Sequence, residues 1–468
     1  MTTTSIAMPT LDPAEVYPIV GELTAHEAWS RDRLLEHQRR KLDATLRRVV
    51  EASAYYRDVL GRSIDAATPL EELPILTKST LMEQWDRIVT DPRLRLRDVE
   101  AHLAGDRAGT LLLDEYRVCA TSGTTGERAV VVYDRAAWHQ VVANLLRFLA
   151  AAGASPDSRV IGVGAPTPLH LTNRVNAELR AGRTDAPVLS VITPLPEVVG
   201  ALNAYQPEYI GTYPSFIRRL VEEQEAGRLR IHPLKVSSMA EVLAPDVRDL
   251  ARTVWGADIM DSYGCTEGGL LGAECEAVAG IHVAEDLLVF EAVDEHGRAV
   301  PPGTPSARVL LTTLFNGVLP LIRYEISDIV AMADGLCPCG RPFARVASIV
   351  GRREEYLVLR AGCGGDVRVH ASRLRAPLAG VPGLRQFQIV PAFDRLRLVV
   401  SAREEARPED VVAAASARVG RALRDLGADV NMTTEVVREI HRVGTGAKEL
   451  LVGTATFGQP LAPTARGG

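Results

Sequence analysis

The chain has 468 residues, of which 46% are hydrophobic and 24% are charged, as in ordinary globular proteins. This length indicates at least two domains. The formal net charge of −6 is mild, and no Lys/Arg-rich run is interleaved with aromatic residues, so nucleic acid is not an expected partner.

The sequence contains no run of about 18 apolar residues, so we expect no membrane span. The first eight residues lack the basic start and the long apolar core of a signal peptide. We therefore expect a cytoplasmic protein with no membrane partner. Its six cysteines should then be reduced thiols or metal ligands rather than disulfides.

The first part of the chain, residues 1–110, is expected to be helical. Residues 25–60 form a charged amphipathic pattern that predicts a single helix. Its apolar stripe comprises Leu35, Leu42, Leu46, Val49 and Val50. Two strands with a loop between them are expected next, over 111–119 and 130–133.

Strands and helices then alternate. The pattern predicts helices over 141–152 and 216–225, and short buried strands over 159–164 and 208–212, which contain the runs Val-Ile-Gly-Val and Tyr-Ile-Gly. Such alternation is typical of a largely parallel sheet covered by helices on both faces.

From Asp286 the pattern changes to strands broken by Gly and Pro turns, over 287–292, 307–313, 321–332 and 346–349. A small α+β unit should follow, with a hairpin (386–389 and 396–401), a helix (408–427) and a strand (430–439). The predicted fold class is α/β. A large domain, 1–353, combines mostly parallel sheets with a distorted β region, and a small mobile C-terminal domain spans 354–468.

A loop of hydroxyl residues and glycines, Thr121-Ser122-Gly123-Thr124-Thr125-Gly126, lies between the first two expected strands. Glycines let the backbone approach a ligand, and successive N–H groups and hydroxyls form a concave anion site. The loop lacks the Lys-Ser/Thr that closes a P-loop. Taken alone, it is equally compatible with a phosphate cradle and with a flexible turn.

Four further motifs follow in order: Tyr263-Gly264-Cys265-Thr266-Glu267, then 323–328 ending in Asp328, then 351–355 beginning Gly-Arg-Arg, and finally a glycine-flanked Lys448. Their order and spacing resemble the adenylate-forming superfamily of acyl-CoA synthetases, adenylation domains and luciferases, most of all its phenylacetate-CoA ligase branch. The resemblance covers about 31–452, including the phrase Leu73-Pro74-Ile75-Leu76-Thr77-Lys78.

This resemblance implies an enzyme that activates a small, aromatic or related carboxylic acid with ATP and Mg²⁺, and then transfers the acyl group from acyl-AMP to coenzyme A. It makes the 121–126 loop the cradle for the β- and γ-phosphates. Glu267 would bind Mg²⁺, Thr266 would contact the α-phosphate, and Lys448 would stabilise charge during adenylation.

The resemblance also assigns the nucleoside contacts. Tyr263 and the segment 238–241, with Ala240 and Glu241, would lie against adenine. Asp328 would accept hydrogen bonds from the ribose, and Arg352 would reach ribose or phosphate. Glu354 matches the position of the hinge between the two domains. The acyl pocket is expected to include Tyr213, Pro214, Ser215, Cys265 and His170.

The chain departs from the family pattern at three places. Glu127-Arg128 replaces the usual Lys-Pro after the phosphate loop, Tyr324-Glu325-Ile326-Ser327-Asp328 replaces Tyr-Arg-Thr-Gly-Asp, and His441-Arg442 replaces Pro-Arg before the lysine loop. A lysine contact to phosphate at the first place is therefore in doubt.

A possible metal site stands apart from these motifs. Cys275, His282, Cys337 and Cys339 offer three thiolates and one imidazole, the ligand set of a closed structural zinc site. The CxC spacing is less usual than CxxC, so buried reduced cysteines beside an unrelated histidine remain the alternative.

Several alternatives stay open at this point. The acyl acceptor could be a carrier-protein thiol or an amine instead of coenzyme A. A protein of another class, a non-catalytic zinc-stabilised nucleotide-binding protein, is disfavoured by Glu267, Asp328 and Lys448. The sequence does not name the acid and leaves a homodimer open.

Overall fold

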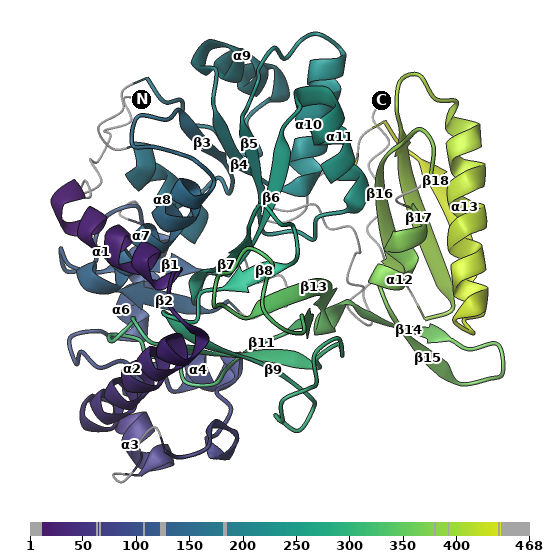
Figure 1. Cartoon of the computed structure of the whole chain (residues 1–468). Coiled ribbons are helices and arrows are strands. Elements are labelled where there is room, and N and C mark those ends of the chain that lie inside the picture. The colour runs from purple at the N-terminus through teal and green to yellow at the C-terminus, as the bar shows by residue number, and fades with distance from the viewer. Residues whose placement is uncertain are drawn as a thin grey trace. The chain divides into compact units, whose positions relative to one another are not determined.

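The computed structural model describes residues 12–61, 64, 67–105, 108–121, 128–180, 185–378, 381–391, 393–438 and 440. These residues form two compact units, one ending at Val350 and the other beginning at Gly351 (Figure 1). The expected domain boundary between 353 and 354 stays a prediction. Each unit is described by itself.

Helices form the N-terminal part of the first unit. They are α1 (Pro13–His26), α2 (Arg31–Ala52), α3 (Ala54–Leu60), α4 (Lys78–Glu83), α5 (Trp85–Ile88) and α6 (Leu96–Ala104). The single helix expected over 25–60 is therefore wrong. Ser30 and Ser53 each accept a hydrogen bond from a backbone N–H three residues later, which is N-cap geometry, so each serine begins a new helix.

The apolar stripe of α2 was also misplaced at one position. Leu34 is fully buried, whereas Leu35 is 40% exposed. The other four expected residues of the stripe are buried. Leu34 and Leu35 project about 100° apart around the helix axis, so only one of them can face the core.

The largest sheet has eight strands in the order β12-β13-β8-β7-β6-β5-β4-β3. Their bounds are β3 (Val160–Val163), β4 (Tyr209–Thr212), β5 (Lys235–Ser238), β6 (Asp258–Cys265), β7 (Gly269–Glu274), β8 (Ile281–Val283), β12 (Asp328–Met332) and β13 (Arg345–Arg352). Strands β3 to β6 are parallel, and the sheet becomes antiparallel from β6 to β7. The expected α/β class is confirmed, with a sheet that is mixed.

Helices cover the parallel part of this sheet. Its helices are α7 (Arg135–Ala151), α8 (Leu171–Arg180), α9 (Leu195–Tyr205), α10 (Pro214–Glu225) and α11 (Pro245–Trp255). Side chains of α9, α10 and α11 share one apolar core with Ile161, Ile210, Val236 and Ile259 of the strands, and Figure 1 shows these helices beside them. Residues of α7 and α8 lie at the opposite face of the strands.

Two smaller sheets complete the first unit. One is the antiparallel pair β1 (Arg117–Ala120) and β2 (Val130–Tyr133). The other is antiparallel, with the order β11-β10-β9, from β9 (Leu288–Val293), β10 (Arg308–Thr313) and β11 (Tyr324–Ile326). The strand expected over 321–332 is thus two strands in different sheets, separated at Ser327.

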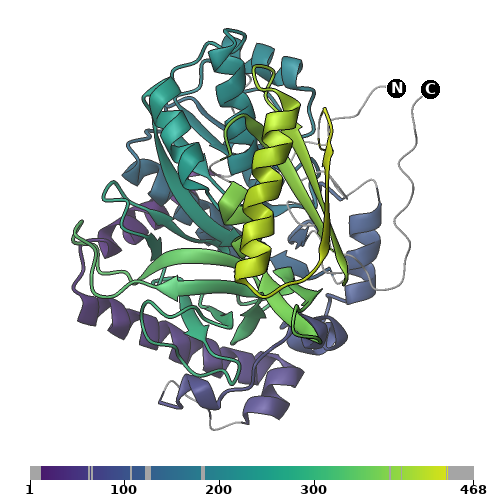
Figure 2. The ribbon, with the colours of Figure 1, turned by 90° about the vertical axis from the view of Figure 1, so that its right-hand side faces the viewer.

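The second unit contains the pair β14 (Tyr356–Arg360) and β15 (Asp366–His370), the short helix α12 (Ser372–Arg375), and a three-stranded sheet. In that sheet β16 (Leu384–Pro391) and β17 (Arg395–Ala402) form the expected hairpin, and β18 (Asn431–Val436) runs parallel to β17. Helix α13 (Pro408–Asp425) lies along this sheet (Figure 2) and shares its apolar core.

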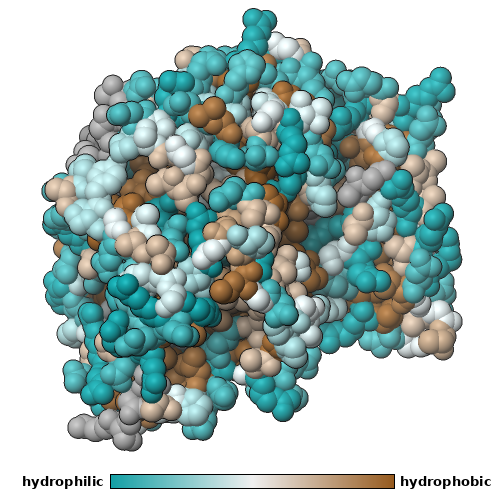
Figure 3. All heavy atoms as spheres, in the orientation of Figure 1, coloured by the Kyte–Doolittle hydropathy of each residue, from teal (hydrophilic) through white to brown (hydrophobic). Residues whose placement is uncertain are grey.

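Among the described residues, no helix combines the length and the apolar character needed to cross a membrane. On the face drawn in Figure 3, hydrophobic residues form small separate groups among hydrophilic ones.

A buried ion cluster joins the N-terminal helix to the core. Asp286 accepts hydrogen bonds from His26 Nδ1 at 2.9 Å and from Arg147 Nη1 at 2.6 Å, and all three side chains are buried. Although burial alone raises the pKa of Asp286, Arg147 and His26 bring that pKa below its usual value. The carboxylate thus stays charged, and it connects α1, α7 and the segment before β9.

A second carboxylate, that of Asp261, lies on β6 and is partly buried. It accepts hydrogen bonds from the hydroxyl of Ser238 on the neighbouring strand at 2.8 Å and from the N–H of Ser262 at 3.1 Å. Burial raises its pKa from 3.8 to about 6, and the nearby Glu274 adds to the rise.

Asp261→Asn should increase the free energy of unfolding, and the gain should grow with pH. The carboxyl group of Asp261 keeps its proton to a higher pH in the folded chain than in the unfolded chain. The stability contributed by Asp261 is therefore present below about pH 3.8 and is lost as pH rises through about 6. The gain above that pH should reach about 3 kcal/mol at most. Urea unfolding of both proteins across this range measures it, and a gain that does not change with pH contradicts the assignment.

Candidate active site

The hairpin β1–β2 presents the expected phosphate loop. Thr121 at its base donates its N–H to Ala129 O and accepts the Ala129 N–H on Oγ1, both at 2.9 Å. These two bonds pair the residues on either side of the segment 122–127, and a strand precedes and follows that segment as expected. The first strand begins at Arg117 and not at 111, because residues 112–116 form a turn. Ser122, Gly123, Thr124, Thr125 and Gly126 lie outside the described residues.

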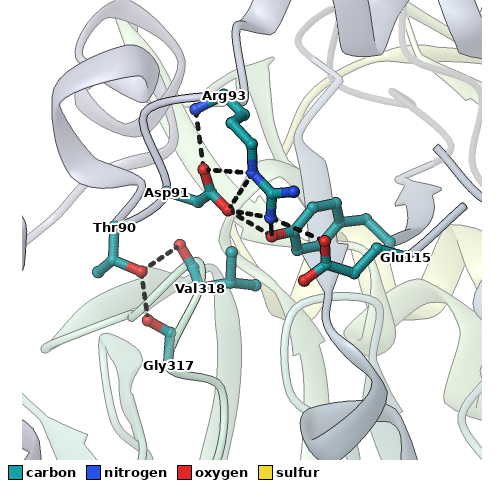
Figure 4. A network of polar contacts seen from close by, with 7 residues as sticks. Thr90, Asp91, Arg93, Glu115, Gly317 and Val318 are labelled. Carbon is teal, nitrogen blue, oxygen red and sulfur yellow. Dashed lines mark hydrogen bonds and ion pairs between the residues drawn. The ribbon is translucent and has the colours of Figure 1, made fainter. Parts of the chain in front are cut away.

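A polar network fixes the approach to this hairpin (Figure 4). Asp91 accepts hydrogen bonds from the hydroxyl of Tyr116, which directly precedes β1, at 2.5 Å and from Arg93 at 2.6 Å. The Arg93 guanidinium holds the pKa of Asp91 well below its usual range. The adjacent Thr90 donates its hydroxyl to Gly317 O at 2.8 Å. The start of β1 is thereby held to the segment that follows β10.

Glu267 and Asp328 are brought together by two tyrosines that bond in a crossed manner. Tyr263 and Glu267 belong to one motif, and Tyr324 and Asp328 to another, each with the same spacing of four residues. Tyr263 Oη donates to Asp328 Oδ2 at 2.7 Å, and Tyr324 Oη donates to Glu267 Oε1 at 2.9 Å. All four side chains are buried. The tyrosine hydroxyl of each motif therefore donates a hydrogen bond to the carboxylate of the other motif.

Burial, and then the neighbouring Glu267 carboxylate, raise the pKa of Tyr324 far above its usual value, so the phenol stays a donor. Oε1 of Glu267 accepts the hydrogen bond from Tyr324. No described residue hydrogen-bonds to Oε2 of the same carboxylate. One carboxylate oxygen is thus fixed in place and the other remains available to a ligand.

Thr266 precedes Glu267 in the turn between β6 and β7. Its carbonyl accepts a hydrogen bond from Tyr133 Oη at 2.5 Å, and Tyr133 is the last residue of β2. In the same turn Cys265 Sγ accepts the N–H of Gly268 at 3.2 Å. The hairpin β1–β2 and the turn that carries Thr266 and Glu267 are therefore joined by a direct hydrogen bond.

Arg323 has a structural role in the site that the sequence analysis did not predict. It is buried, has a positive φ of 46°, and donates to Leu73 O at 2.8 Å and Gly297 O at 2.7 Å while it pairs with Glu291. Leu76 in turn pairs with Tyr324. The signal was the phrase beginning Leu73-Pro74, which the resemblance singled out without giving it a role.

The segment 238–241, which is expected to lie against adenine, meets the start of α10. Glu241 accepts hydrogen bonds from the N–H and the hydroxyl of Ser215, at 3.1 and 3.2 Å. Ala240 has a positive φ of 66°, and Tyr213 is buried. The fold thus places two predicted groups, Ala240 with Glu241 and Tyr213 with Pro214 and Ser215, side by side at the carboxyl ends of β4 and β5.

A small, mostly apolar hollow of about 50 Å³ lies between the parallel strands and helices α7 and α8. Its walls include Leu149, Asn176, Gly211, Met239 and Met260. None of the five residues expected in the acyl pocket lines it. His170 instead contacts Thr167 Oγ1 through Nδ1 at 2.9 Å. Their place in an acyl pocket stays a prediction.

The four candidate metal ligands come together. One ligand atom from each of Cys275, His282, Cys337 and Cys339 lies within 4.8 Å of all the others. Cys275 Sγ is 3.7 Å from Cys337 Sγ, and Cys339 Sγ is 3.4 Å from His282 Nε2. Ligands at tetrahedral angles around zinc would be separated by about 3.4–3.8 Å, so these spacings fit.

Strand pairing explains why residues so far apart in sequence meet here. His282 lies on β8 and pairs with Arg345 on β13, and Cys275 directly follows β7. Arg345 donates to the carbonyls of Ala279 and Gly335, which belong to the loops that carry the cysteines. Burial, then the positive charges of Arg341 and Arg345, lower the pKa of His282 to about 4. The imidazole is therefore neutral, as a ligand must be.

The remaining predicted residues are outside this assembly. Arg352 lies in the second unit, where its carbonyl contacts His370 Nε2 at 3.0 Å. Lys448 and its loop lie outside the described residues, as does the side chain of Glu354.

Comparison with known proteins gives a family match. Residues 108–307 match the model of the AMP-binding enzyme family. The chain is 29% identical to the phenylacetate-coenzyme A ligase of Thermus thermophilus, over 89% of this chain and 88% of the relative. It is also 29% identical to the enzyme of that name from Escherichia coli K12, over 71% of this chain and 74% of the relative.

Solved structures share the fold. A crystal structure of 2-hydroxyisobutyryl-CoA ligase in the postadenylation state superposes with a TM-score of 0.65 at 22% identity, covering 95% of this chain and 91% of that one. An anthranilate CoA ligase in complex with anthranoyl-AMP gives a TM-score of 0.52 at 14% identity, over 70% and 64%. The family match over residues 108–307, the sequence similarity to phenylacetate-coenzyme A ligases and the shared fold agree with the resemblance to the adenylate-forming superfamily and its phenylacetate-CoA ligase branch.

Proposed function

We propose that the chain activates a small aromatic carboxylic acid with ATP and transfers the acyl group to coenzyme A. The observation that carries the proposal is the crossed bonding of Tyr263 to Asp328 and of Tyr324 to Glu267, because it gathers a metal-binding carboxylate and a ribose-binding carboxylate within one buried assembly. The names of the relatives, phenylacetate-coenzyme A ligases, support an aromatic acid.

The residues divide the chemistry among them. The carboxylate oxygen of the acid attacks the α-phosphorus of ATP, and the bond to pyrophosphate breaks. Glu267 would hold, through its second oxygen, the Mg²⁺ that accompanies the phosphates, since Mg²⁺ takes one or two carboxylates beside phosphate oxygens. Thr266 contacts the α-phosphate, and the loop from Thr121 to Gly126 holds the other two. Coenzyme A then adds its thiol to the acyl carbon, and AMP leaves.

Exchange of labelled pyrophosphate into ATP tests the first half-reaction. It should depend on an added aryl acid and should proceed without coenzyme A. Thioester should form only when coenzyme A is supplied. Pyrophosphate exchange without thioester formation would indicate that the acyl acceptor is a carrier-protein thiol or an amine. The absence of exchange with every acid would reject adenylation.

Lys448→Ala should reduce acyl-AMP formation by roughly 10²–10³ while ATP binding changes little, because a preorganised cation acts on charge that develops in the transition state. Single-turnover formation of acyl-AMP measures the loss. Thioester formation from pre-made acyl-AMP should survive better. Lys41→Ala on α2 is the control, and equal loss in both half-reactions would contradict the role.

We further propose that Cys275, His282, Cys337 and Cys339 hold one structural Zn²⁺. The spacings of 3.7 and 3.4 Å and the neutral imidazole support this ligand set. Burial raises the pKa of Cys275 to about 12 when no metal is bound, so binding at neutral pH must release a proton. The site would tie the loop after β7 to the loop between β12 and β13.

Cys337→Ser should lower both zinc content and melting temperature, since structural metal binding contributes directly to folding. Elemental analysis of protein purified without added metal should give about one zinc per wild-type chain. Cys363→Ser changes an exposed cysteine in the second unit and is the matched control. Metal-free wild-type protein would refute the site.

The two compact units support a two-domain enzyme whose smaller domain changes orientation between the half-reactions. One orientation brings Lys448 to the α-phosphate, and another opens the way for the acceptor. We propose that the backbone near Glu354 absorbs this rotation, because a hinge needs only a few residues to change their dihedral angles.

Glu354→Pro should impair one half-reaction much more than the other, because proline fixes φ at about −65° at that position. Single-turnover rates of adenylation and thioester formation are the measurement. Glu354→Ala, which removes the side chain but leaves φ free, is the control and should affect both rates little. Equal slowing of both steps by the proline would place the hinge elsewhere.

A further inference from the structure

The second unit begins at a tightly packed glycine. Gly351 is its first residue, is buried, and has a positive φ of 138°. A Cβ atom there would lie 2.5 Å from Oε2 of Glu355, 2.8 Å from Cε1 of His370 and 3.1 Å from Nη2 of Arg375. Three side chains thus close around this point of the backbone, and glycine is the residue that leaves room for them.

His370 holds the residue that follows this glycine. It is the last residue of β15, is buried, and its Nε2 lies 3.0 Å from the carbonyl oxygen of Arg352. On the other side of the ring, Nδ1 accepts the N–H of Ser372 at 3.3 Å and lies 2.8 Å from the Ser372 hydroxyl. Because Nδ1 is an acceptor, the proton of the neutral imidazole lies on Nε2, which donates to the Arg352 carbonyl.

The imidazole is neutral and fixed in orientation. Burial, with the positive charge of Arg375, lowers the pKa of His370 below its usual value, although the Arg352 carbonyl and Glu355 oppose this change. Tyr356 pairs with His370 across β14 and β15, and the two rings meet edge to face with 4.8 Å between their centroids. Arg375 Nη2 in turn donates to Glu355 Oε2 at 2.7 Å. The ring that bonds to Arg352 is therefore held from several sides.

The bond matters because of what Arg352 carries. Its guanidinium is the group that the resemblance assigns to the ribose or a phosphate of ATP. The backbone at Arg352 is extended, with φ −108° and ψ 150°, and the rotamers open to a side chain depend on these two angles. A hydrogen bond to the carbonyl oxygen of Arg352 restricts ψ, so it also restricts where the guanidinium can lie.

We infer that His370 is a positioning residue for ATP binding. Its Nε2–H fixes the backbone of Arg352, and the Arg352 guanidinium is thereby presented to the nucleotide in one orientation. His370 acts through Arg352 and needs no contact of its own with ATP. The inference rests on the proposed function, because it requires Arg352 to contact the nucleotide.

Two substitutions separate the two nitrogens of the ring. The amide of His370→Gln can place an N–H where Nε2 lies, whereas the shorter amide of His370→Asn reaches only the position of Nδ1. His370→Asn should raise KM for ATP by about 10-fold and change kcat by less than about 3-fold, because the lost contact binds ATP equally in the ground state and the transition state. His370→Gln should keep KM within about 3-fold of the wild type.

Two measurements give these values. Acid-dependent pyrophosphate exchange at varied ATP, with the aryl acid that the wild type accepts best, yields KM and kcat. Titration calorimetry with MgATP yields Kd in the absence of any acid, so ATP binding is followed independently of the reaction. Kd should change in parallel with KM.

A double-mutant cycle tests whether His370 acts through Arg352. Arg352→Gln keeps the backbone carbonyl, removes the guanidinium, and should itself raise KM for ATP. Adding His370→Asn to Arg352→Gln should raise KM no further, because the group that the histidine positions is gone. Ser416→Ala is the control. It removes a hydrogen bond of 2.7 Å to Thr434 in the same unit and should leave KM unchanged, whatever its effect on the melting temperature.

Ser372→Ala keeps the test decisive if His370→Asn folds poorly. It removes the hydroxyl beside Nδ1 and should raise KM for ATP by a smaller factor, which should also disappear in the Arg352→Gln background. The inference is overturned if His370→Asn or Arg352→Gln leaves KM unchanged. It is also overturned if the asparagine and glutamine variants raise KM equally, or if the effects of His370→Asn and Arg352→Gln add in full. Failure of the wild type to exchange pyrophosphate with every acid would instead reject the proposed function, and calorimetry with MgATP would still test the role of His370.

Discussion

The crossed tyrosine–carboxylate pairs are the constraint on which the rest of the site depends. Tyr263 lies on β6 and Glu267 in the turn from β6 to β7, whereas Tyr324 begins β11 and Asp328 begins β12. Because each hydroxyl serves the acid of the other motif, neither turn can shift alone without leaving a buried carboxylate short of its donor. Such a loss costs more than the net contribution of an ordinary hydrogen bond.

The backbone around these pairs is shaped to allow them. Arg323 adopts a positive φ, which places its guanidinium against the carbonyls of Leu73 and Gly297 while Tyr324 begins β11. Tyr133 then joins this turn to the hairpin β1–β2, and Asn316 Nδ2 donates to Val132 O at 3.0 Å. Three sheets are thus connected within a few bonds of Glu267.

Much of this could be predicted from the sequence where a local pattern determines the outcome. The hairpin around Thr121 followed from a β-branched run after a glycine loop, and the ligand set of Cys275, His282, Cys337 and Cys339 followed from residue type. The helix pattern was less reliable. Ser53 is compatible with a helix interior by composition, and only its bond to Tyr56 N shows that it begins a new helix.

Other features depend on register, which one sequence does not give. Gly162 and Gly211 were visible inside two expected strands, yet nothing in the chain says that they lie opposite each other. Likewise Tyr263 and Tyr324 were each assigned within their own motifs, and their exchange of partners required the positions of β6 and β11. Long-range pairing of this kind is set by the packing of the whole sheet.

The buried cluster of His26, Asp286 and Arg147 has a consequence for how the chain is made. His26 and Asp286 are separated by 260 residues, so helix α1 leaves the ribosome long before its charged partner exists. At typical rates of synthesis the interval is roughly 13–52 s. Helix α7, on which α1 packs and whose Arg147 donates to Leu23 O, is synthesised well before Asp286. Until Asp286 is made, Arg147 and His26 therefore lack the carboxylate that pairs with both of them in the folded protein.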